Sequence, residues 1–362
     1  MTSSRRKRTT LKEVAHRAGV SPTTASFVLN ETPGAAISAA TRARVLDVAR
    51  ALDYLPSAAA RSLVTGETKT LGLVMLRADL LLVDAFVPQL LYGLNHVARR
   101  AGYTVQVEGI DAVAGDDGAP AAEDDDPYLR MIQARGLDGL VVLDPRHGDA
   151  NLARRIADGT PIVTLGTVPG ADPYRVVSDE AAGMRRAAEH LLHGGRRRVA
   201  HLTFSPRGRS GTDARLAGYR AALEGFGVAY DEALVEETGY SAASGADAMA
   251  RLLARRPDLD AVTCGNDTVA LGAMAALADA GLAVPDDVAV VGFDDLPFAA
   301  QLRPALTTVR TDPVAAGERA METLLSLLAG ETPERREIRM PTPLVVRRSC
   351  GVDPPSAGPP PT

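Results

Sequence analysis

The chain has 362 residues, 46% of them hydrophobic, and a formal net charge of −5. This length exceeds one ordinary domain, so two or three folded units are expected. No run of roughly eighteen apolar residues occurs, which excludes a membrane-spanning helix, and the basic N-terminus lacks the apolar core of a secretory signal. Two cysteines are too few for a disulfide framework and fit a reducing cytoplasm.

The net charge hides a split along the chain. Residues 1–66 hold ten lysines and arginines against four acidic residues, whereas the remainder holds 30 basic and 41 acidic residues. A basic head on an acidic body indicates a polyanionic partner for the head alone. Arg5 to Arg8 form a basic arm suited to phosphate groups.

Residues 11–30, LKEVAHRAGVSPTTASFVLN, predict two short helices joined by a glycine turn. The first helix carries an apolar stripe with helical spacing, formed by Leu11, Val14, Ala15 and Ala18. Gly19 can end this helix in the left-handed conformation, Ser21 can cap the second, and Pro22 suits its first turn. Apolar spacing continues through Ala25, Val28 and Leu29 and leaves a small polar outer face. The pattern predicts a helix-turn-helix whose second helix enters the DNA major groove, against the alternative of a solvated helical hairpin.

A third helix is expected to close the core of the head. Ser38 can cap it, and one face carries Val45, Val48, Ala49 and Leu52. Arg42 and Arg44 lie off that face, where they could contact the DNA backbone.

From residue 71 onward, short apolar strands alternate with helices in two series separated by a junction near Ser178. The first series predicts strands at 71–76, 105–107, 137–143 and 161–165 and helices at 88–101, 127–135 and 151–157. The second series predicts helices at 183–192, 215–226, 243–255 and 267–280 and strands at 199–204, 261–264 and 288–293. Continuous apolar strands that alternate with helices indicate parallel sheets covered on both faces. Two Rossmann-like α/β lobes with a ligand-binding cleft between them are therefore expected.

The segments VAHRAGVSPTTASFVLN and SAATRARVLDVARALDYLPSAAARSLVTG resemble the N-terminal module of the LacI/GalR (lactose-repressor) family of transcription factors. The usual pattern of that family is LKDVA-x-x-AGVS-x-x-TVS-x-VLN, then ETR-x-RV and GY-x-PN-x-x-AR-x-L, and the resemblance continues through nearly the whole chain. It implies an all-α helix-turn-helix domain (1–56), a hinge helix and linker (57–68), and a two-lobed, periplasmic-binding-protein-like domain for effector binding and dimerisation (69–350). The Pro-rich tail (351–362) is expected to be disordered.

The resemblance also implies a function. A member of this family is a ligand-responsive regulator, usually a repressor, that binds a pseudo-palindromic operator in double-stranded DNA as a homodimer. A small-molecule effector, for which a sugar is one candidate, changes operator affinity. In the family the chain crosses between the lobes three times, so the first lobe should regain residues after about Pro304.

The resemblance implies DNA contacts by outer residues of the second helix: Ser21, Pro22, Thr23, Thr24, Ser26, Phe27 and Asn30. Pro22 and Thr23 occupy positions that choose bases, and the others touch the backbone or support the turn. Phe27 stands where the family usually carries an arginine that reads guanine. Because phenylalanine cannot donate a hydrogen bond, altered and weaker base specificity is predicted. Burial of Phe27 against the third helix is the alternative.

The linker after Pro56 predicts a short alanine-rich helix, too short to be stable alone in water. The resemblance implies that Leu63 wedges into the minor groove of the operator, with Ala60 as the small residue beside it. A hydrophobic contact within the linker is the alternative for Leu63.

Five residues match effector-binding positions of the family: Phe86, Arg215, Tyr240, Asn266 and Asp294. Each has a structural alternative, such as a helix cap for Asn266, a turn for Asp294 and a surface ion pair for Arg215. Gly166 and Thr167 replace a polar pair that many sugar-responsive relatives carry, which removes one way to hold a hydroxyl group.

Two other classes of protein share parts of this pattern. A secreted solute-binding protein would fit the body but not the basic head or the N-terminus. An enzyme would need a site, and the sequence contains no dinucleotide fingerprint, no phosphate loop and no metal-ligand spacing. The acidic run at residues 123–126 is more typical of a solvated loop than of a metal site. The sequence therefore predicts neither catalysis nor a cofactor nor a bound metal.

Overall fold

The computed structural model describes residues 9–30, 35–54, 62, 66–75, 80–110, 126–134 and 136–352. Two compact units divide the chain, residues 1–69 and residues 70–362. The basic arm, both hinge residues (Ala60 and Leu63) and the tail from residue 353 lie outside the described residues.

The described part of the first unit contains three helices, which start and stop at the residues that the sequence signals indicate. Its helices are α1 (Leu11–Ala18), α2 (Pro22–Leu29) and α3 (Ala39–Ala51). Gly19 ends α1 with φ +62°, and the Ser21 hydroxyl caps α2 by accepting from the Thr24 amide at 3.0 Å. The three helices enclose one apolar core, made of Val14, Ala15, Ala18, Ala25, Val28, Val45 and Ala49. The helix-turn-helix prediction is therefore confirmed as a fold.

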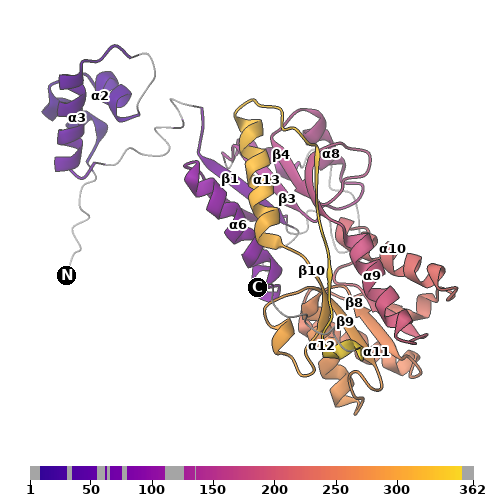
Figure 1. Ribbon diagram of the computed structural model, residues 1–362. Coiled ribbons are helices and arrows are strands. Elements are labelled where there is room, and N and C mark those ends of the chain that lie inside the picture. The colour runs from indigo at the N-terminus through magenta and orange to yellow at the C-terminus, as the bar shows by residue number, and fades with distance from the viewer. Residues whose placement is uncertain are drawn as a thin grey trace, which may run out of the picture. The chain divides into compact units, whose positions relative to one another are not determined.

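The second unit contains two lobes, each built on a six-stranded sheet (Figure 1). The sheet of the first lobe has the order β11 (Glu337–Met340), β5 (Tyr174–Ser178), β4 (Ile162–Leu165), β3 (Gly139–Leu143), β1 (Thr70–Met75) and β2 (Thr104–Gly109). The sheet of the second lobe has the order β12 (Leu344–Val345), β10 (Thr307–Arg310), β9 (Ala289–Asp294), β8 (Ala261–Cys264), β6 (Val199–Leu202) and β7 (Val235–Glu236). Every pairing is parallel except that of β12 with β10.

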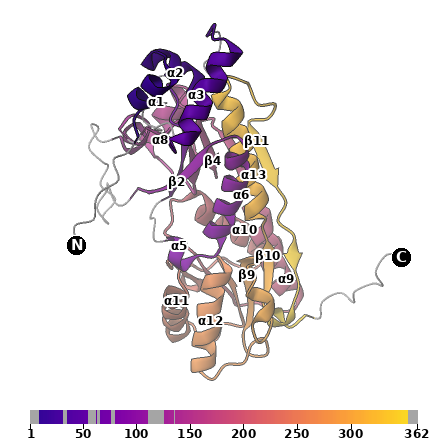
Figure 2. The ribbon, with the colours of Figure 1, turned by 90° about the vertical axis from the view of Figure 1, so that its left-hand side faces the viewer.

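Helices cover both faces of each sheet, as Figures 1 and 2 show. In the first lobe, α6 (Phe86–Arg100) and α13 (Pro313–Leu328) pack on one face, and α7 (Pro127–Gln133) and α8 (Ala150–Ala157) on the other. In the second lobe, α9 (Glu180–His193) and α10 (Ser210–Gly225) lie opposite α11 (Ala242–Arg255) and α12 (Asp267–Asp279). The remaining short elements are α5 (Leu80–Val83) and three 3₁₀ turns at Glu232–Leu234, Ala299–Gln301 and Arg348–Cys350.

Strand residues alternate between the two faces of each sheet. In β1, Leu71, Leu73 and Met75 join the core beneath α6 and α13, whereas Val74 joins the core on the opposite side. Side chains on both faces of the sheet are therefore buried and apolar. For this reason the strands read as continuous apolar runs in the sequence and do not alternate between apolar and polar residues.

The chain crosses between the lobes three times, after β5, after β10 and after β11. The chain returns to the first lobe at Pro313, after Pro304 as the resemblance implied, once β10 (Thr307–Arg310) has completed its pairing in the second sheet. The helices α5 and α13 and the strands β5, β7 (Val235–Glu236), β10, β11 and β12 were not predicted.

The helices α6 and α13 cross at very short distance. A Cβ atom on Gly93 of α6 would lie 2.1 Å from the Val314 carbonyl oxygen, and one on Gly317 of α13 would lie 2.5 Å from the Leu90 carbonyl oxygen. Glycine at both positions therefore lets a helix from late in the chain pack directly on a helix from early in the body.

Candidate functional site

The start of α2 presents the first candidate surface. Ser21, Pro22 and Thr23 are exposed, and Phe27 leaves 36% of its surface exposed while the rest is covered by protein. This position leaves Phe27 able to contact a ligand and also gives it partial packing within the head. Both interpretations of Phe27 therefore retain a physical basis.

The other polar residues of α2 are engaged within the head. The Ser21 and Thr24 hydroxyls lie 2.9 Å apart, and the Asn30 amide nitrogen donates to the Ser26 hydroxyl at 3.1 Å. These contacts fix the two ends of the helix, which leaves Pro22 and Thr23 as the exposed residues without such a role. Arg44, on α3, donates to the Ala18 carbonyl at 2.8 Å, so part of its hydrogen-bonding capacity stabilises the fold of the head.

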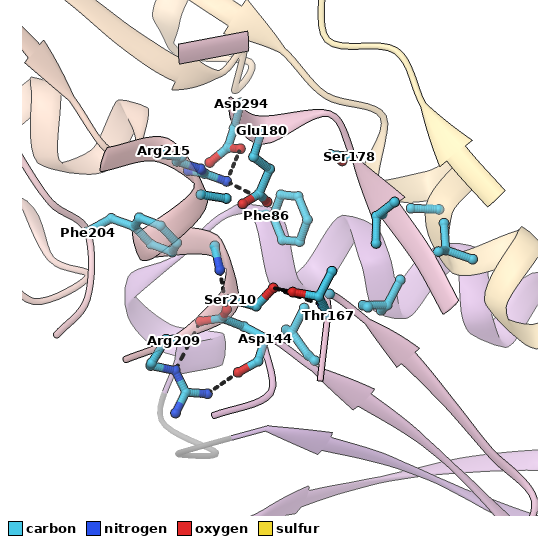
Figure 3. Close-up of a pocket in the computed structure, with 18 of the residues that line it drawn as sticks. Phe86, Asp144, Thr167, Ser178, Glu180, Phe204, Arg209, Ser210, Arg215 and Asp294 are labelled. Carbon is cyan, nitrogen blue, oxygen red and sulfur yellow. Dashed lines mark hydrogen bonds and ion pairs between the residues drawn. The ribbon is translucent and has the colours of Figure 1, made fainter. Parts of the chain in front are cut away.

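The second candidate site is a cavity between the two lobes of the body (Figure 3). Four of the five predicted effector residues line it, namely Phe86 from the first lobe and Arg215, Tyr240 and Asp294 from the second. Asn266 does not. It is fully buried and caps α12, where its side-chain oxygen accepts from the Val269 amide at 2.7 Å. The helix-cap alternative therefore describes Asn266 correctly.

Arg215, on α10, is held at the centre of the polar part of this cavity. Its guanidinium lies 3.3 Å from the Glu180 carboxylate and 3.6 Å from the Asp294 carboxylate, and it also donates to the Gly265 carbonyl. The rings of Phe204 and Phe293 lie 4.2 Å and 3.9 Å from the guanidinium carbon. Ring stacking and charge pairing together fix the plane of the guanidinium.

Asp294 ends β9 in an uncommon backbone conformation, with φ +105°. Burial raises the pKa of its carboxyl group to about 7; the Arg215 charge opposes this shift, and the nearby Asp84 and Glu180 carboxylates add to it. A carboxyl group poised in this way can accept or donate a hydrogen bond near neutral pH. Backbone strain and an altered pKa together are typical of a functional site.

Aromatic side chains supply the apolar part of the cavity. Phe86 is the first residue of α6, and Tyr240 packs against the apolar cores of both lobes. The Phe204 and Tyr240 rings meet edge to face with their centroids 5.7 Å apart. Flat apolar walls beside a few fixed polar groups are the usual composition of a small-molecule site.

Beside the cavity the lobes contact each other along a seam, which consists of residues 144–147 and 166–167 of the first lobe and residues 208–213 of the second. Asp144 accepts from the Arg209 Nε at 3.0 Å and from the Gly211 amide at 2.9 Å (Figure 3). The His147 amide donates to the Gly208 carbonyl at 2.8 Å. The cavity is therefore bounded by direct polar contacts between the lobes.

Gly166 and Thr167 belong to this seam. The Thr167 amide donates to the Ser210 hydroxyl at 2.8 Å, across the lobes. Gly166 has φ +128°, and a Cβ atom there would lie 2.9 Å from both the Ser210 hydroxyl and the Pro145 ring. Gly166 and Thr167, which stand in place of the polar pair of many relatives, thus allow the two lobes to approach each other closely.

Six charged residues of the described cavity lining were not predicted from the sequence: Asp84, Asp144, Asp179, Glu180, Arg209 and Arg339. Asp144 directly follows the predicted strand at 137–143, the same signal that drew attention to Asp294, so it could have been found. Asp84, Glu180 and Arg209 carry no such signal, because only the packing of the lobes brings them to the cavity.

No helix in the described part of the chain is long and apolar enough to cross a bilayer. No three histidine, cysteine or acidic side chains within the described ranges are grouped so that they could hold a metal ion.

Comparison with known proteins matches both units. Residues 10–57 match the family described as bacterial regulatory proteins, lacI family, and residues 188–350 match the periplasmic binding protein-like domain. The transcriptional regulator CelR of Thermobifida fusca is 33% identical over 350 residues, which cover 95% of this chain and 99% of the relative. The transcriptional repressor PurR of Erwinia tasmaniensis is 32% identical over 349 residues, covering 95% and 98%.

Solved structures agree with this relationship. A lac repressor dimer bound to operator and the anti-inducer ONPF has a TM-score of 0.80 at 27% identity and covers 95% of this chain and 99% of its own. A CelR–cellobiose complex has a TM-score of 0.69 at 30% identity, covering 94% and 100%. The chain therefore belongs to the lacI family of bacterial regulatory proteins, and it is a ligand-responsive, DNA-binding transcriptional regulator.

Proposed function

We propose that the chain acts as a homodimeric, cytoplasmic repressor that binds a pseudo-palindromic operator and answers to a small-molecule effector bound between its lobes. The observation that carries this function is a cavity lined by residues of both lobes in a chain that also contains a helix-turn-helix. A ligand that contacts both lobes changes their arrangement, and a family member couples that arrangement to operator affinity. We assign no catalytic role, no metal and no cofactor.

In the head, α2 would enter the major groove with Pro22 and Thr23 at the bases. Ser21, Thr24, Ser26 and Asn30 would touch the DNA backbone or support the helix, and Phe27 would face the base that an arginine reads in relatives. Ala60 and Leu63, by resemblance, would contact the minor groove. The basic arm supplies phosphate contacts, so affinity should depend steeply on salt.

In the body, Phe86 and Tyr240 would cover the apolar face of the effector, while Arg215 and Asp294 would hold its polar groups. A sugar fits this combination of rings and fixed polar groups. Asn266 is left out because it is buried as a helix cap. One of the similar structures is a CelR–cellobiose complex, and another is a lac repressor bound to the anti-inducer ONPF. A sugar-like effector is therefore the first class of ligand to test.

The test is fluorescence anisotropy of the full chain with duplexes selected from a random pool, over a range of salt concentrations. We expect tight binding at low salt, a steep loss of affinity as salt rises, and a change in affinity with one member of a panel of sugars. Thr23→Ala should change the selected bases and leave the salt dependence intact, because Thr23 carries no charge. Failure of the wild type to bind any duplex at low ionic strength would contradict the function.

A further inference from the structure

The cavity between the lobes contains more negative than positive side chains. Its described lining includes five carboxylates (Asp84, Asp144, Asp179, Glu180 and Asp294) and three guanidinium groups (Arg209, Arg215 and Arg339). Asp144 pairs with Arg209 at 3.0 Å and Asp179 with Arg339 at 3.6 Å. The other three carboxylates are left with Arg215 alone, so two negative charges lack a partner when all are ionised.

Asp84 is the carboxylate with the weakest compensation. It precedes α6 in the first lobe and is only 8% exposed. One of its oxygens accepts from the Phe86 amide at 2.9 Å, and it forms no ion pair within the described part of the chain. Across the cavity stand Glu180 and Asp294 of the second lobe, which share the single guanidinium of Arg215. The two lobes therefore present like charges to each other around the ligand space.

The positive charge of Arg215 is already compensated by carboxylates of the cavity, although its buried Nε has no hydrogen-bond partner among the described residues. Its guanidinium already contacts two carboxylates and the Gly265 carbonyl, and aromatic rings lie near it at 4.2 Å and 3.9 Å. Arg209 and Arg339 are likewise held by Asp144 and by Asp179 and Glu337. An anion would enter a site whose described lining has more carboxylates than guanidinium groups and in which each described guanidinium already contacts a carboxylate, which is unfavourable where water is excluded.

We propose that the effector carries a protonated amine that lies between Asp84 of the first lobe and the Glu180–Asp294 pair of the second. An ammonium group donates three hydrogen bonds and accepts none, so it suits a site of facing carboxylates. The aromatic rings of Phe86 and Tyr240 would cover the carbon skeleton of the same molecule. This assignment rests on the proposed effector function and narrows it from a sugar to an amine-bearing ligand such as an amino sugar.

The raised pKa values of the cavity carboxyl groups are consistent with this charge excess. Burial raises the pKa of the Asp84 and Glu180 carboxyl groups as well as that of Asp294. Protons thus take the place that a cationic ligand would occupy, and the ligand would displace them on binding.

The test is calorimetry and thermal shift of the full chain at pH 7 with matched probes. Glucosamine, galactosamine and mannosamine are compared with their N-acetyl derivatives, their parent hexoses and the corresponding uronic acids, and ethanolamine and putrescine serve as simple amines. We expect at least one amine to bind tenfold or more tightly than its neutral or anionic counterpart. Asp84→Asn, which keeps the acceptor for the Phe86 amide, should remove that preference and leave binding of the neutral counterpart within about twofold.

Two controls keep the outcome decisive. Glu322→Gln removes one carboxylate from an exposed ion pair on α13 and should leave the amine preference unchanged. Asp294→Asn serves as a second cavity variant if Asp84→Asn is unstable. The amine assignment is overturned if no amine probe binds, or if a neutral or anionic probe binds as tightly as its amine. If such a probe also changes operator affinity, the effector function stands without the amine; if no compound of any charge does so, the effector function itself fails.

Discussion

The guanidinium of Arg209 and the carboxylate of Asp144 meet at 3.0 Å although they belong to different lobes. Both side chains are largely buried, at 9% and 17% exposure. Removal of one partner of a buried pair leaves the other charge uncompensated, which usually costs several kcal/mol. This contact therefore links the stability of the body to the arrangement of its lobes.

Arg209→Gln should lower the free energy of unfolding by about 3 kcal/mol and increase the fraction of open molecules. Chemical denaturation measures the first effect, and small-angle scattering of the full chain measures the second. Arg319→Ala is the matched control, because it breaks the exposed pair with Glu322 and should cost less than about 1 kcal/mol. Equal losses for both variants would show that the seam does not hold the lobes together.

Gly166→Ala should weaken both stability and effector binding. Its methyl group would lie 2.9 Å from the Ser210 hydroxyl, so the lobes would have to move apart. Gly170→Ala is the control, since φ is +81° there and no atom lies within 4 Å of the added carbon. We expect Gly170→Ala to lower the free energy of unfolding by about 1 kcal/mol through backbone strain alone. Gly166→Ala should lower it further, by about 1–3 kcal/mol, through overpacking. Thermal denaturation with and without ligand separates these effects.

Asp294 should make stability fall as the pH rises from about 4 to about 7. Its pKa is about 7 in the folded chain against 3.8 ordinarily, so in this range the folded state binds more protons than the unfolded state. The neighbouring Asp84 and Glu180 act in the same direction, while Arg215 stays charged. Asp294→Asn should therefore flatten the melting temperature over this range. If the melting temperature of Asp294→Asn fell with rising pH as steeply as that of the wild type, Asp294 would not be the source of this pH dependence.

Phe27 should select against the guanine contact usual in the family. Selection of duplexes from a random pool should show no guanine preference at that step for the wild type, and Phe27→Arg should restore one worth about 1–3 kcal/mol. An undiminished guanine preference in the wild type would mean that another residue reads this base.

Leu63→Ala should reduce operator bending and leave effector affinity unchanged, because the resemblance places this leucine in the minor groove. Energy transfer between dyes at the two ends of an operator duplex measures the bend. An unaltered bend would count against the wedge.

The head could be predicted from the sequence almost to the residue, because its determinants are local. Gly19 and Ser21 act on the helices next to them, and Val14 and Val45 keep their helical spacing in the three-helix core. The strands β1 to β4, β6, β8 and β9 of the body were recognisable for the same reason, because their apolar runs are local. Leu29 was expected to be buried but is only half-buried, since it lies at the end of α2.

The rest depended on contacts between distant parts of the chain. β11 pairs with β5 although the partners Arg175 and Glu337 are 162 residues apart in the sequence, and no local pattern reports such a pairing. Asp84 and Arg209 become cavity residues only because the lobes meet. Asn266 carried the same signal as Asp294, a polar residue after a strand, and its burial as a cap could not be distinguished from a ligand contact by sequence alone.

The crossing of α6 and α13 through Gly93 and Gly317 has a consequence for synthesis on the ribosome. A nascent chain that has emerged only to β10 carries the second lobe except for β12 and the turn at Arg348–Cys350, but its first lobe lacks a helical cover and an edge strand. The first lobe, although it begins first, therefore stays uncovered at α6 until α13 has emerged, and until then the apolar face of α6 is open to chaperones or to misassembly with another nascent chain.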